Sequence, residues 1–287
     1  MNAATANSPP SHMPGDRMAD RFIQINEERI RYREAGTGPS VVLVHGWTLD
    51  LQMWEAQSAA LQAGYRVISY DRRGFGLSTG TPSIDADCTD LDAICRRVAP
   101  GPVALVGMSQ GVRPVLRMSQ SAPERVACLV LDGPPDFDSN GDEVELSRYR
   151  ELVQSKGIDA FRGEWSAHPL MRLVTRDPTV HSALAAMTQR YPGRELTSAE
   201  VLSEPTAPVR PESVTAPALV ITGNCDLPGR TRAADRLAAR LPNSERATIP
   251  GAGHLATLDN PTLYNQLLRT FLARHIELSN PTPRSVS

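Results

Sequence analysis

One short stretch of the chain places a serine between two glycines. The pentapeptide Gly107-Met-Ser109-Gln-Gly111 follows the apolar run 103–106 and precedes a helical pattern. Glycines at this spacing permit a sharp strand-to-helix turn that exposes the serine hydroxyl. Serine is a weak nucleophile until a neighbouring base removes its proton. The alternative is that Ser109 only caps the following helix, because serine is a favoured N-cap residue.

A histidine near the carboxyl end can supply that base. His254 lies in the glycine-rich segment IPGAGHLATLDNP, between the last apolar run and the last helical pattern. The pKa of imidazole suits it to remove a proton from serine near neutral pH. The other histidines are weaker candidates because of their positions in the chain. They are His12, His45, His168, His181 and His275.

An acid must orient the imidazole, and two aspartates are candidates. Asp226 closes the tetrapeptide GNCD after the apolar run 218–222 and precedes His254 in the chain. Asp132 follows the run 127–131 and can also reach the histidine from the end of its strand. We favour Asp226, because it alone sits in a Gly-x-x-Asp loop ahead of the histidine loop.

The oxyanion that forms during acyl transfer needs hydrogen-bond donors. The sequence His45-Gly-Trp47 follows the run 40–44, and the backbone N–H of Trp47 can serve together with that of Gln110. We expect His45 to pack and hydrogen-bond within its own loop rather than to act as a second base or a metal ligand. Pro114 cannot donate a hydrogen bond to the carbonyl of Gln110 and should loosen the helical turn there.

These candidates stand at the ends of strand-like runs that alternate with helical patterns. Residues 22–35 alternate apolar and polar positions in two halves, which predicts an opening hairpin. Runs rich in Val, Ile and Leu follow at 40–44, 66–70, 103–106, 127–131, 218–222 and 246–249. Helical patterns lie near 51–63, 84–98, 110–121, 230–241 and 260–275. This alternation predicts an α/β fold with a mostly parallel sheet and helices on both faces.

The alternation is interrupted once. Residues 136–210 contain helical patterns near 143–156 and 180–190 but no comparable strand. We interpret 136–210 as a small helical cap over the carboxyl edge of the sheet, where ligands bind in open α/β folds. The other predicted segments are a disordered lead at 1–19, the core at 20–135 and 211–276, and a flexible tail at 277–287.

The charge and hydropathy of the chain argue against several classes of partner. Thirty basic and 32 acidic residues leave a net charge of −2 without a basic block, which disfavours nucleic acid and anionic membranes. No run approaches the roughly 20 apolar residues of a membrane helix, and the amino terminus lacks the apolar region of a signal peptide. The single lysine, Lys156, indicates a G+C-rich bacterial genome.

The cysteines show no metal-ligand or redox spacing. We interpret all four as reduced and structural, as in a cytoplasmic protein. No metal cluster, phosphate-binding loop or cofactor motif is evident, so we predict chemistry without a cofactor. The four are Cys88, Cys95, Cys128 and Cys225.

Residues of the predicted cap and of the catalytic loops could line a substrate pocket. They offer mostly apolar surface with one polar contact, and packing within the cap is the alternative for each cap residue. They are Trp47, Trp165, His168, Leu170, Met171 and Leu255. Arg162 and Arg172 could bind a substrate carboxylate, although exposure on a helix is the commoner state of arginine.

Together these motifs resemble the α/β-hydrolase superfamily over nearly all of 20–275. They are HGW at 45–47, YDRRGFGLS at 70–78, GMSQG at 107–111, GNCD at 223–226 and GAGH at 251–254. The chain is similar to enol-lactonases and related carboxylesterases, and to cofactor-free haloperoxidases with aryl-esterase activity. The resemblance implies Ser109 as nucleophile, His254 as base and Asp226 as orienting acid. It gives Asp71 and Arg73 a structural role in a turn.

The resemblance also implies an activity. We expect a serine hydrolase that cleaves a small carboxylic ester or lactone through an acyl-enzyme. Ser109 argues against haloalkane dehalogenases and epoxide hydrolases of this fold, whose nucleophile is aspartate. Carbon–carbon bond hydrolysis or perhydrolysis by the same triad, and non-catalytic binding of a small molecule, are the alternatives. The oligomeric state is left open.

Overall fold

The computed structural model describes residues 18–137, 144–198 and 208–276 of the 287-residue chain. Nearly all of the predicted lead and the whole predicted tail lie outside these residues. In the described part of the chain, no helix is long and apolar enough to span a lipid bilayer.

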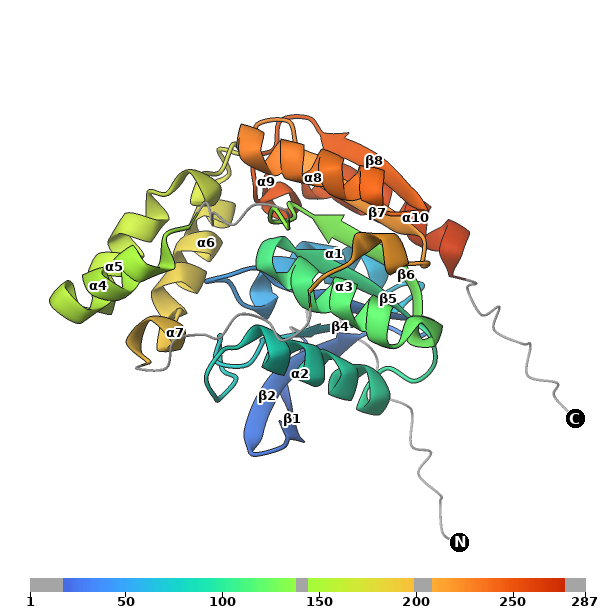
Figure 1. Cartoon of the computed structure of the whole chain (residues 1–287), viewed down its shortest axis with the longest axis horizontal. Coiled ribbons are helices and arrows are strands. Elements are labelled where there is room, and N and C mark those ends of the chain that lie inside the picture. The colour runs from blue at the N-terminus through green and yellow to red at the C-terminus, as the bar shows by residue number, and fades with distance from the viewer. Residues whose placement is uncertain (1–17, 138–143, 199–207, 277–287) are drawn as a thin grey trace, which may run out of the picture.

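One eight-stranded sheet forms the centre of the described molecule, in the order β1-β2-β4-β3-β5-β6-β7-β8 (Figure 1). The strands are β1 (Arg21–Ile25), β2 (Glu28–Ala35), β3 (Ser40–Val44), β4 (Arg66–Tyr70), β5 (Val103–Met108), β6 (Val126–Asp132), β7 (Ala218–Gly223) and β8 (Ser244–Ile249). β2 pairs antiparallel with β1 and β4, and all the other pairings are parallel. The predicted α/β class, opening hairpin and mostly parallel sheet are confirmed.

Helices cover both faces of the sheet because successive strand residues point to opposite sides. Val41 and Leu43 belong to one hydrophobic cluster, together with α1 and α10. Val42 and Val44 belong to the other cluster, together with α2, α3 and α8. The helices are α1 (Glu55–Leu61), α2 (Ile84–Arg97), α3 (Val112–Ser121), α8 (Pro228–Arg240), α9 (Ala256–Asp259) and α10 (Pro261–His275).

Among the described residues between β6 and β7, four further helices group together at the left of Figure 1. They are α4 (Leu146–Lys156), α5 (Ile158–Ser166), α6 (Pro178–Arg190) and α7 (Arg194–Thr197). Their buried side chains Phe161, Trp165 and Tyr191 belong to the same hydrophobic cluster as Trp47 and Leu49 of the core. This helical insertion, called the cap below, therefore packs on the loop that follows β3.

The carboxyl ends of the central strands meet at one edge of the sheet. β5 continues two residues beyond the predicted run and ends at Met108, so Ser109 follows it directly. Met108 pairs with Asp132 at the end of β6, and Val44 at the end of β3 pairs with Gly107. This register brings the loops that follow β3, β5 and β6 to the same place.

The four cysteines are free thiols. Burial raises the pKa of Cys88, Cys95 and Cys128 to about 12, so these thiols stay protonated at neutral pH. Cys225 is exposed on the loop that follows β7, next to Asp226.

Candidate active site

Ser109 occupies a strained turn between β5 and α3. Its φ angle is 51°, in the left-handed region that non-glycine residues seldom adopt. The two glycines of the pentapeptide give this turn room. A Cβ on Gly107 would lie 2.6 Å from the carbonyl oxygen of Gly111, and a Cβ on Gly111 would lie 2.6 Å from that of His45. The Gly-x-Ser-x-Gly spacing is therefore a packing requirement of the turn.

The helix after this turn accommodates its proline. Residues Ser109–Gly111 form a 3₁₀ turn, and α3 begins at Val112. Pro114 is then the third residue of α3, where a backbone N–H has no acceptor within the helix. The proline thus leaves the helix intact, and the turn that precedes it is 3₁₀ rather than α-helical.

His254 bridges Ser109 and Asp226. The Ser109 hydroxyl donates to His254 Nε2 at 3.1 Å, and His254 Nδ1–H donates to Asp226 Oδ2 at 3.0 Å. A carboxylate only accepts hydrogen bonds, so this arrangement fixes the proton on Nδ1 and leaves Nε2 free to accept. Gly133, with a φ of 52°, gives the imidazole room, because a Cβ there would lie 2.8 Å from His254 Cε1.

The second candidate acid, Asp132, stands apart from this hydrogen-bonded chain. It is the last residue of β6 and is fully buried. Burial, and next the negative charge of Asp226, raise the pKa of Asp132 well above its ordinary value. Burial therefore favours the neutral acid at Asp132, whereas a carboxylate is the form that stabilises a protonated histidine.

The loop after β3 lies against Ser109. A Cβ on Gly46 would lie 2.7 Å from Met108 Sδ and 3.3 Å from Ser109 Cβ, so only glycine allows this approach. Trp47 follows directly, with its side chain in the pocket over Ser109. Gln110 is the second residue of the 3₁₀ turn, where a backbone N–H lacks an acceptor within the helix. The two predicted donors thus belong to segments on either side of Ser109.

His45 is a structural residue in this loop. Its Nε2 accepts from the backbone N–H of Arg72 at 2.9 Å, and its Nδ1 donates to the carbonyl of Gly46 at 2.7 Å. Burial, and next the charge of Arg72, lower the pKa of His45 to about 3. The imidazole therefore stays neutral, with both nitrogens occupied.

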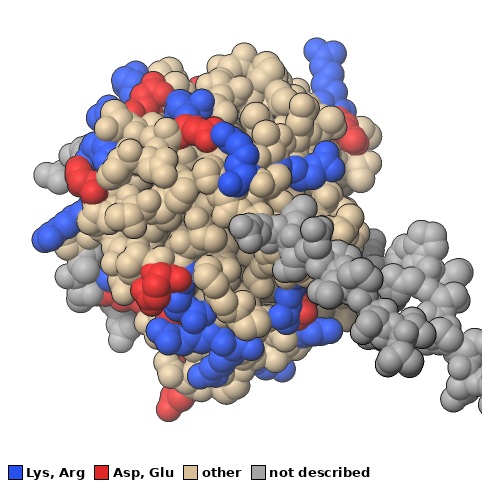
Figure 2. Space-filling view, turned by 90° about the vertical axis from the view of Figure 1, so that its right-hand side faces the viewer, with Lys and Arg blue, Asp and Glu red and all other residues tan. Residues whose placement is uncertain are grey.

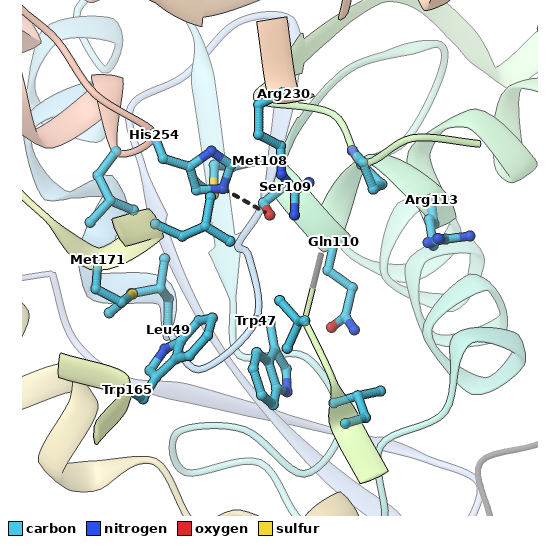
Figure 3. Close-up of a pocket in the computed structure, with 15 residues that line it drawn as sticks. Trp47, Leu49, Met108, Ser109, Gln110, Arg113, Trp165, Met171, Arg230 and His254 are labelled. Atoms are coloured by element: carbon cyan, nitrogen blue, oxygen red, sulfur yellow. Dashed lines mark hydrogen bonds between the residues drawn. The ribbon is translucent and has the colours of Figure 1, made fainter. Parts of the chain in front are cut away.

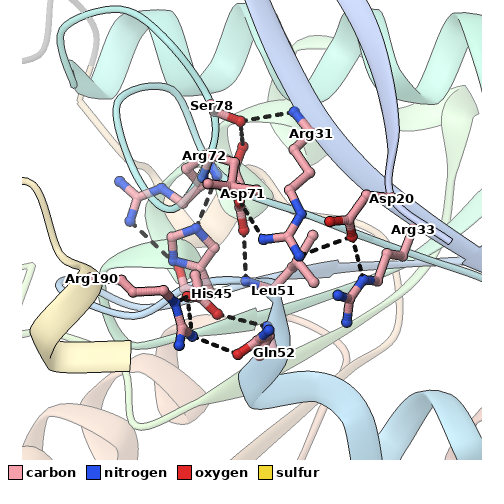
Figure 4. A network of polar contacts seen from close by, with 12 residues as sticks. Asp20, Arg31, Arg33, His45, Leu51, Gln52, Asp71, Arg72, Ser78 and Arg190 are labelled. Atoms are coloured by element: carbon pink, nitrogen blue, oxygen red, sulfur yellow. Dashed lines mark hydrogen bonds and ion pairs between the residues drawn. The ribbon is translucent and has the colours of Figure 1, made fainter. Parts of the chain in front are cut away.

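The turn motif at 70–78 supports the same loop (Figure 4). Asp71 accepts from the backbone N–H of Leu51 at 2.9 Å and of Leu77 at 2.8 Å. Arg72 forms a buried ion pair with Asp87 and donates to the side-chain oxygen of Gln110 at 2.9 Å. These contacts bind the loop after β4 to the loop after β3 and to the turn at Ser109.

A pocket of about 680 Å³, including its open mouth, lies over Ser109 and His254 (Figure 3). Its lining is mostly apolar with a few polar groups, as is usual in sites for small ligands. The predicted residues Trp47, Trp165, Leu170, Met171 and Leu255 line it, and so do residues that the sequence analysis did not single out. The latter are Leu49, Met108, Arg113, Pro135, Val144, Leu146 and Arg230.

His168 and the two arginines of the cap lie elsewhere. His168 stacks on Trp165 with ring centroids 4.4 Å apart, and its Nδ1 accepts from the backbone N–H of Leu170 at 3.2 Å. It does not line the pocket, because it caps a short 3₁₀ turn instead. Arg162 donates to Asp159 and to the carbonyl of Tyr191 within the cap, and Arg172 is exposed.

Polar contacts join the cap to three residues of the loop after β3, which are Trp47, Thr48 and Asp50. Trp47 Nε1 donates to Glu195 of α7 at 2.5 Å, and Trp165 Nε1 of α5 donates to Thr48 Oγ1 at 2.7 Å. Arg190 of α6 donates to Asp50 at 2.8 Å. Burial raises the pKa of Glu195, even though Tyr191 and Trp47 both donate to it.

Comparison with known proteins agrees with this architecture. The family described as alpha/beta hydrolase fold matches residues 39–261, and the chain belongs to this family. A protein from Synechocystis sp., provisionally named a non-heme chloroperoxidase, is 30% identical over 274 residues, which cover 88% of this chain and 99% of the relative.

Two solved structures illustrate the range of the family. A thermophilic esterase from Thermogutta terrifontis has a TM-score of 0.77 and 26% identity, covering 91% of this chain and 100% of that one. The enol-lactonase from Burkholderia xenovorans LB400 has a TM-score of 0.75 at 21% identity, covering 88% of this chain and 100% of that one, which shows a common fold. The fold and the family thus define an α/β hydrolase, a class of enzymes.

Proposed function

We propose that the protein is a serine hydrolase that cleaves small carboxylic esters or lactones through an acyl-enzyme. The observation that carries this proposal is the hydrogen-bonded chain from Asp226 through His254 to Ser109, at 3.0 and 3.1 Å, which opens into the pocket. The thermophilic esterase among the structural neighbours supports the choice of an ester bond.

The proposed acylation follows from the positions of these groups. Ser109 Oγ attacks the substrate carbonyl carbon while its proton passes to His254 Nε2. Asp226 stabilises the imidazolium that forms, and the backbone N–H groups of Trp47 and Gln110 hold the oxyanion. The imidazolium then protonates the departing alkoxide, leaving the acyl group on Ser109.

Deacylation repeats these steps with water as the nucleophile. His254 removes a proton from the water, which attacks the acyl carbon, and then returns the proton to Ser109. Hydrogen peroxide in place of water would release a peracid. The relative named as a chloroperoxidase favours this perhydrolysis as a second activity of the same acyl-enzyme.

A panel of 4-nitrophenyl esters and small lactones tests the proposal. Ser109→Ala should abolish turnover, and Asp226→Asn should lower kcat by about a thousandfold to ten-thousandfold. The matched control is Asp132→Asn, which makes the same change at the acid that has no hydrogen bond to His254 and should stay within about tenfold of the wild type.

Two outcomes would contradict these roles. If the wild-type protein hydrolysed none of the esters and lactones, the hydrolase proposal would be wrong. A loss of activity in Asp132→Asn as large as that in Asp226→Asn would transfer the role of the acid to Asp132.

A further inference from the structure

One carboxylate joins the cap to the loop that carries His254. Asp259, the last residue of α9, accepts through Oδ1 from the backbone N–H of Val174 at 2.7 Å and of Thr175 at 2.9 Å. Its Oδ2 accepts from the backbone N–H of Gly253 at 2.8 Å, and Gly253 directly precedes His254. A single side chain of the core thus contacts the backbone of the cap and the backbone next to the proposed base.

Both of the segments that meet at this carboxylate lead into the pocket. The histidine loop, residues 250–255, contributes His254 to the lining. The cap segment, residues 172–177, follows a 3₁₀ turn whose residues Leu170 and Met171 also line the pocket. Figure 3 shows Met171 and His254 on the same side of the pocket. Movement of either segment would therefore change the shape of the site.

Close packing at Gly253 is a second observation at the same junction. A Cβ on Gly253 would lie 3.2 Å from the carbonyl oxygen of Arg172 and 3.7 Å from Val174 Cγ2. It would also lie 3.4 Å from Asp259 Oδ2. Glycine therefore lets the cap segment approach the histidine loop closely enough for one carboxylate to reach both.

We infer that Asp259 is a positioning residue that holds His254 and the apolar wall of the cap in one arrangement, and so influences which acyl chains the enzyme accepts. This inference rests on the proposed hydrolase function and adds a residue that acts through the backbone of two others. A carboxylate suits the task because it only accepts hydrogen bonds and has two oxygens for N–H groups from different segments.

Two esters of different length test this role. They are 4-nitrophenyl acetate and 4-nitrophenyl hexanoate, whose longer chain has four more methylene groups with which to contact Leu170 and Met171. In Asp259→Ala, kcat should fall by about tenfold to a hundredfold for both esters, because His254 loses its fixed position. The hexanoate-to-acetate ratio of kcat/KM should also fall by about threefold to tenfold, because the apolar wall is no longer held in place.

Two further variants separate positioning from a general structural effect. Asp177→Ala removes a carboxylate that caps α6 through the N–H of Thr179 at 2.8 Å, and should leave the ratio unchanged. Asp259→Asn keeps one acceptor oxygen and should retain more activity than Asp259→Ala. A general loss of folded protein would lower the rates for both esters by the same factor, so it would not change the ratio.

Hydrogen–deuterium exchange tests the junction without a substrate. In Asp259→Ala, the backbone amides of 172–177 and of 251–255 should both exchange faster than in the wild type. Asp177→Ala should leave the exchange of 251–255 unchanged. Faster exchange in both segments would support the shared anchor even if the wild type hydrolysed no ester. Faster exchange in only one segment or in neither, or an ester ratio in Asp259→Ala equal to that of the active wild type, would overturn the inference and leave the serine hydrolase in place.

Discussion

His45 illustrates how one buried side chain makes stability depend on pH. Its pKa is lowered to about 3 in the folded protein, against an ordinary value near 6.5. Between these values the unfolded chain binds the proton and the folded chain does not. Acidification therefore favours unfolding, by about 1.4 kcal/mol for each pH unit below roughly 6.5.

We expect His45→Gln to weaken this dependence. Glutamine keeps an acceptor for the N–H of Arg72 but has no titrating group. The difference in unfolding free energy between wild type and variant should shrink by about 2 kcal/mol from pH 7 to pH 5, as measured by urea denaturation. Burial, and next the charge of Asp50, raise the pKa of Asp71 to about 6, which acts in the opposite direction in both proteins. A difference that stays constant over this range would show that His45 does not supply the dependence.

The sequence predicts the candidate catalytic residues better than it predicts the pocket. Ser109, Asp226 and His254 lie in the segments that follow β5, β7 and β8, so their meeting at one sheet edge can be read from the order of elements. Arg113 and Arg230 resemble ordinary surface arginines on helices. The available signal was their spacing, because each follows a candidate catalytic residue by one helical turn.

At the scale of elements, the loop after β3 depends on the cap. Arg190 of α6 pairs with Asp50, whose side chain is 3% exposed, and Asp50 also caps the 3₁₀ turn Leu51–Trp54. Two further contacts between cap and loop are the hydrogen bonds donated by the indole N–H groups of Trp47 and Trp165. The proposed oxyanion donor Trp47 is therefore positioned by residues of the cap as well as by the core.

We expect Arg190→Met to lower kcat by about two- to tenfold with little change in KM, because a shifted loop misplaces a donor used in the transition state. Steady-state kinetics with a 4-nitrophenyl ester provide the measurement. The control is Arg162→Met, since Arg162 bonds to Asp159 and to the carbonyl of Tyr191, both of which belong to the cap. Equal kinetic effects of the two substitutions would refute a role for the Arg190 contact in positioning the loop.

In the cap, the sequence predicts only some of the helices. The longer helices α4 and α6 match the helical patterns that the sequence predicts near 143–156 and 180–190. The shorter helices α5 and α7 begin after Gly157 and Gly193, both with positive φ. Each contacts Trp47, α5 through the ring of Phe161 and α7 through the carboxyl group of Glu195. Elements of this length are set by tertiary contacts more than by their own pattern.

At the scale of the whole molecule, acidic and basic residues are balanced in number, and the sheet edge formed by β8 carries paired charges. Acidic and basic side chains are interspersed on the face opposite the cap (Figure 2). The outer strand β8 carries Glu245, paired with Arg274, and Arg246, paired with Asp235. Charged residues on an edge strand oppose pairing with a second sheet.

Replacing both Glu245 and Arg246 by valine should make the protein associate as its concentration rises. Valine favours strand pairing and removes the charges that oppose it. Light scattering over a concentration series measures the effect, and the double substitution by serine is the control that also removes the charges without adding apolar surface. Unchanged scattering in the valine variant would show that the edge is protected by other means.

Cys225 in the core and Lys156 in the cap allow these two parts of the molecule to be labelled with different reagents. Cys225 is exposed on the core, while the other three thiols stay protonated, and the sole lysine is exposed at the end of α4 in the cap. A maleimide dye on the thiol and an amine-reactive dye on the lysine would make a donor–acceptor pair across the cap–core boundary. Lys156→Arg would isolate the label on the amino terminus. The chain therefore offers one labelling site on the cap and one on the core, so that energy transfer can report changes in the distance between them.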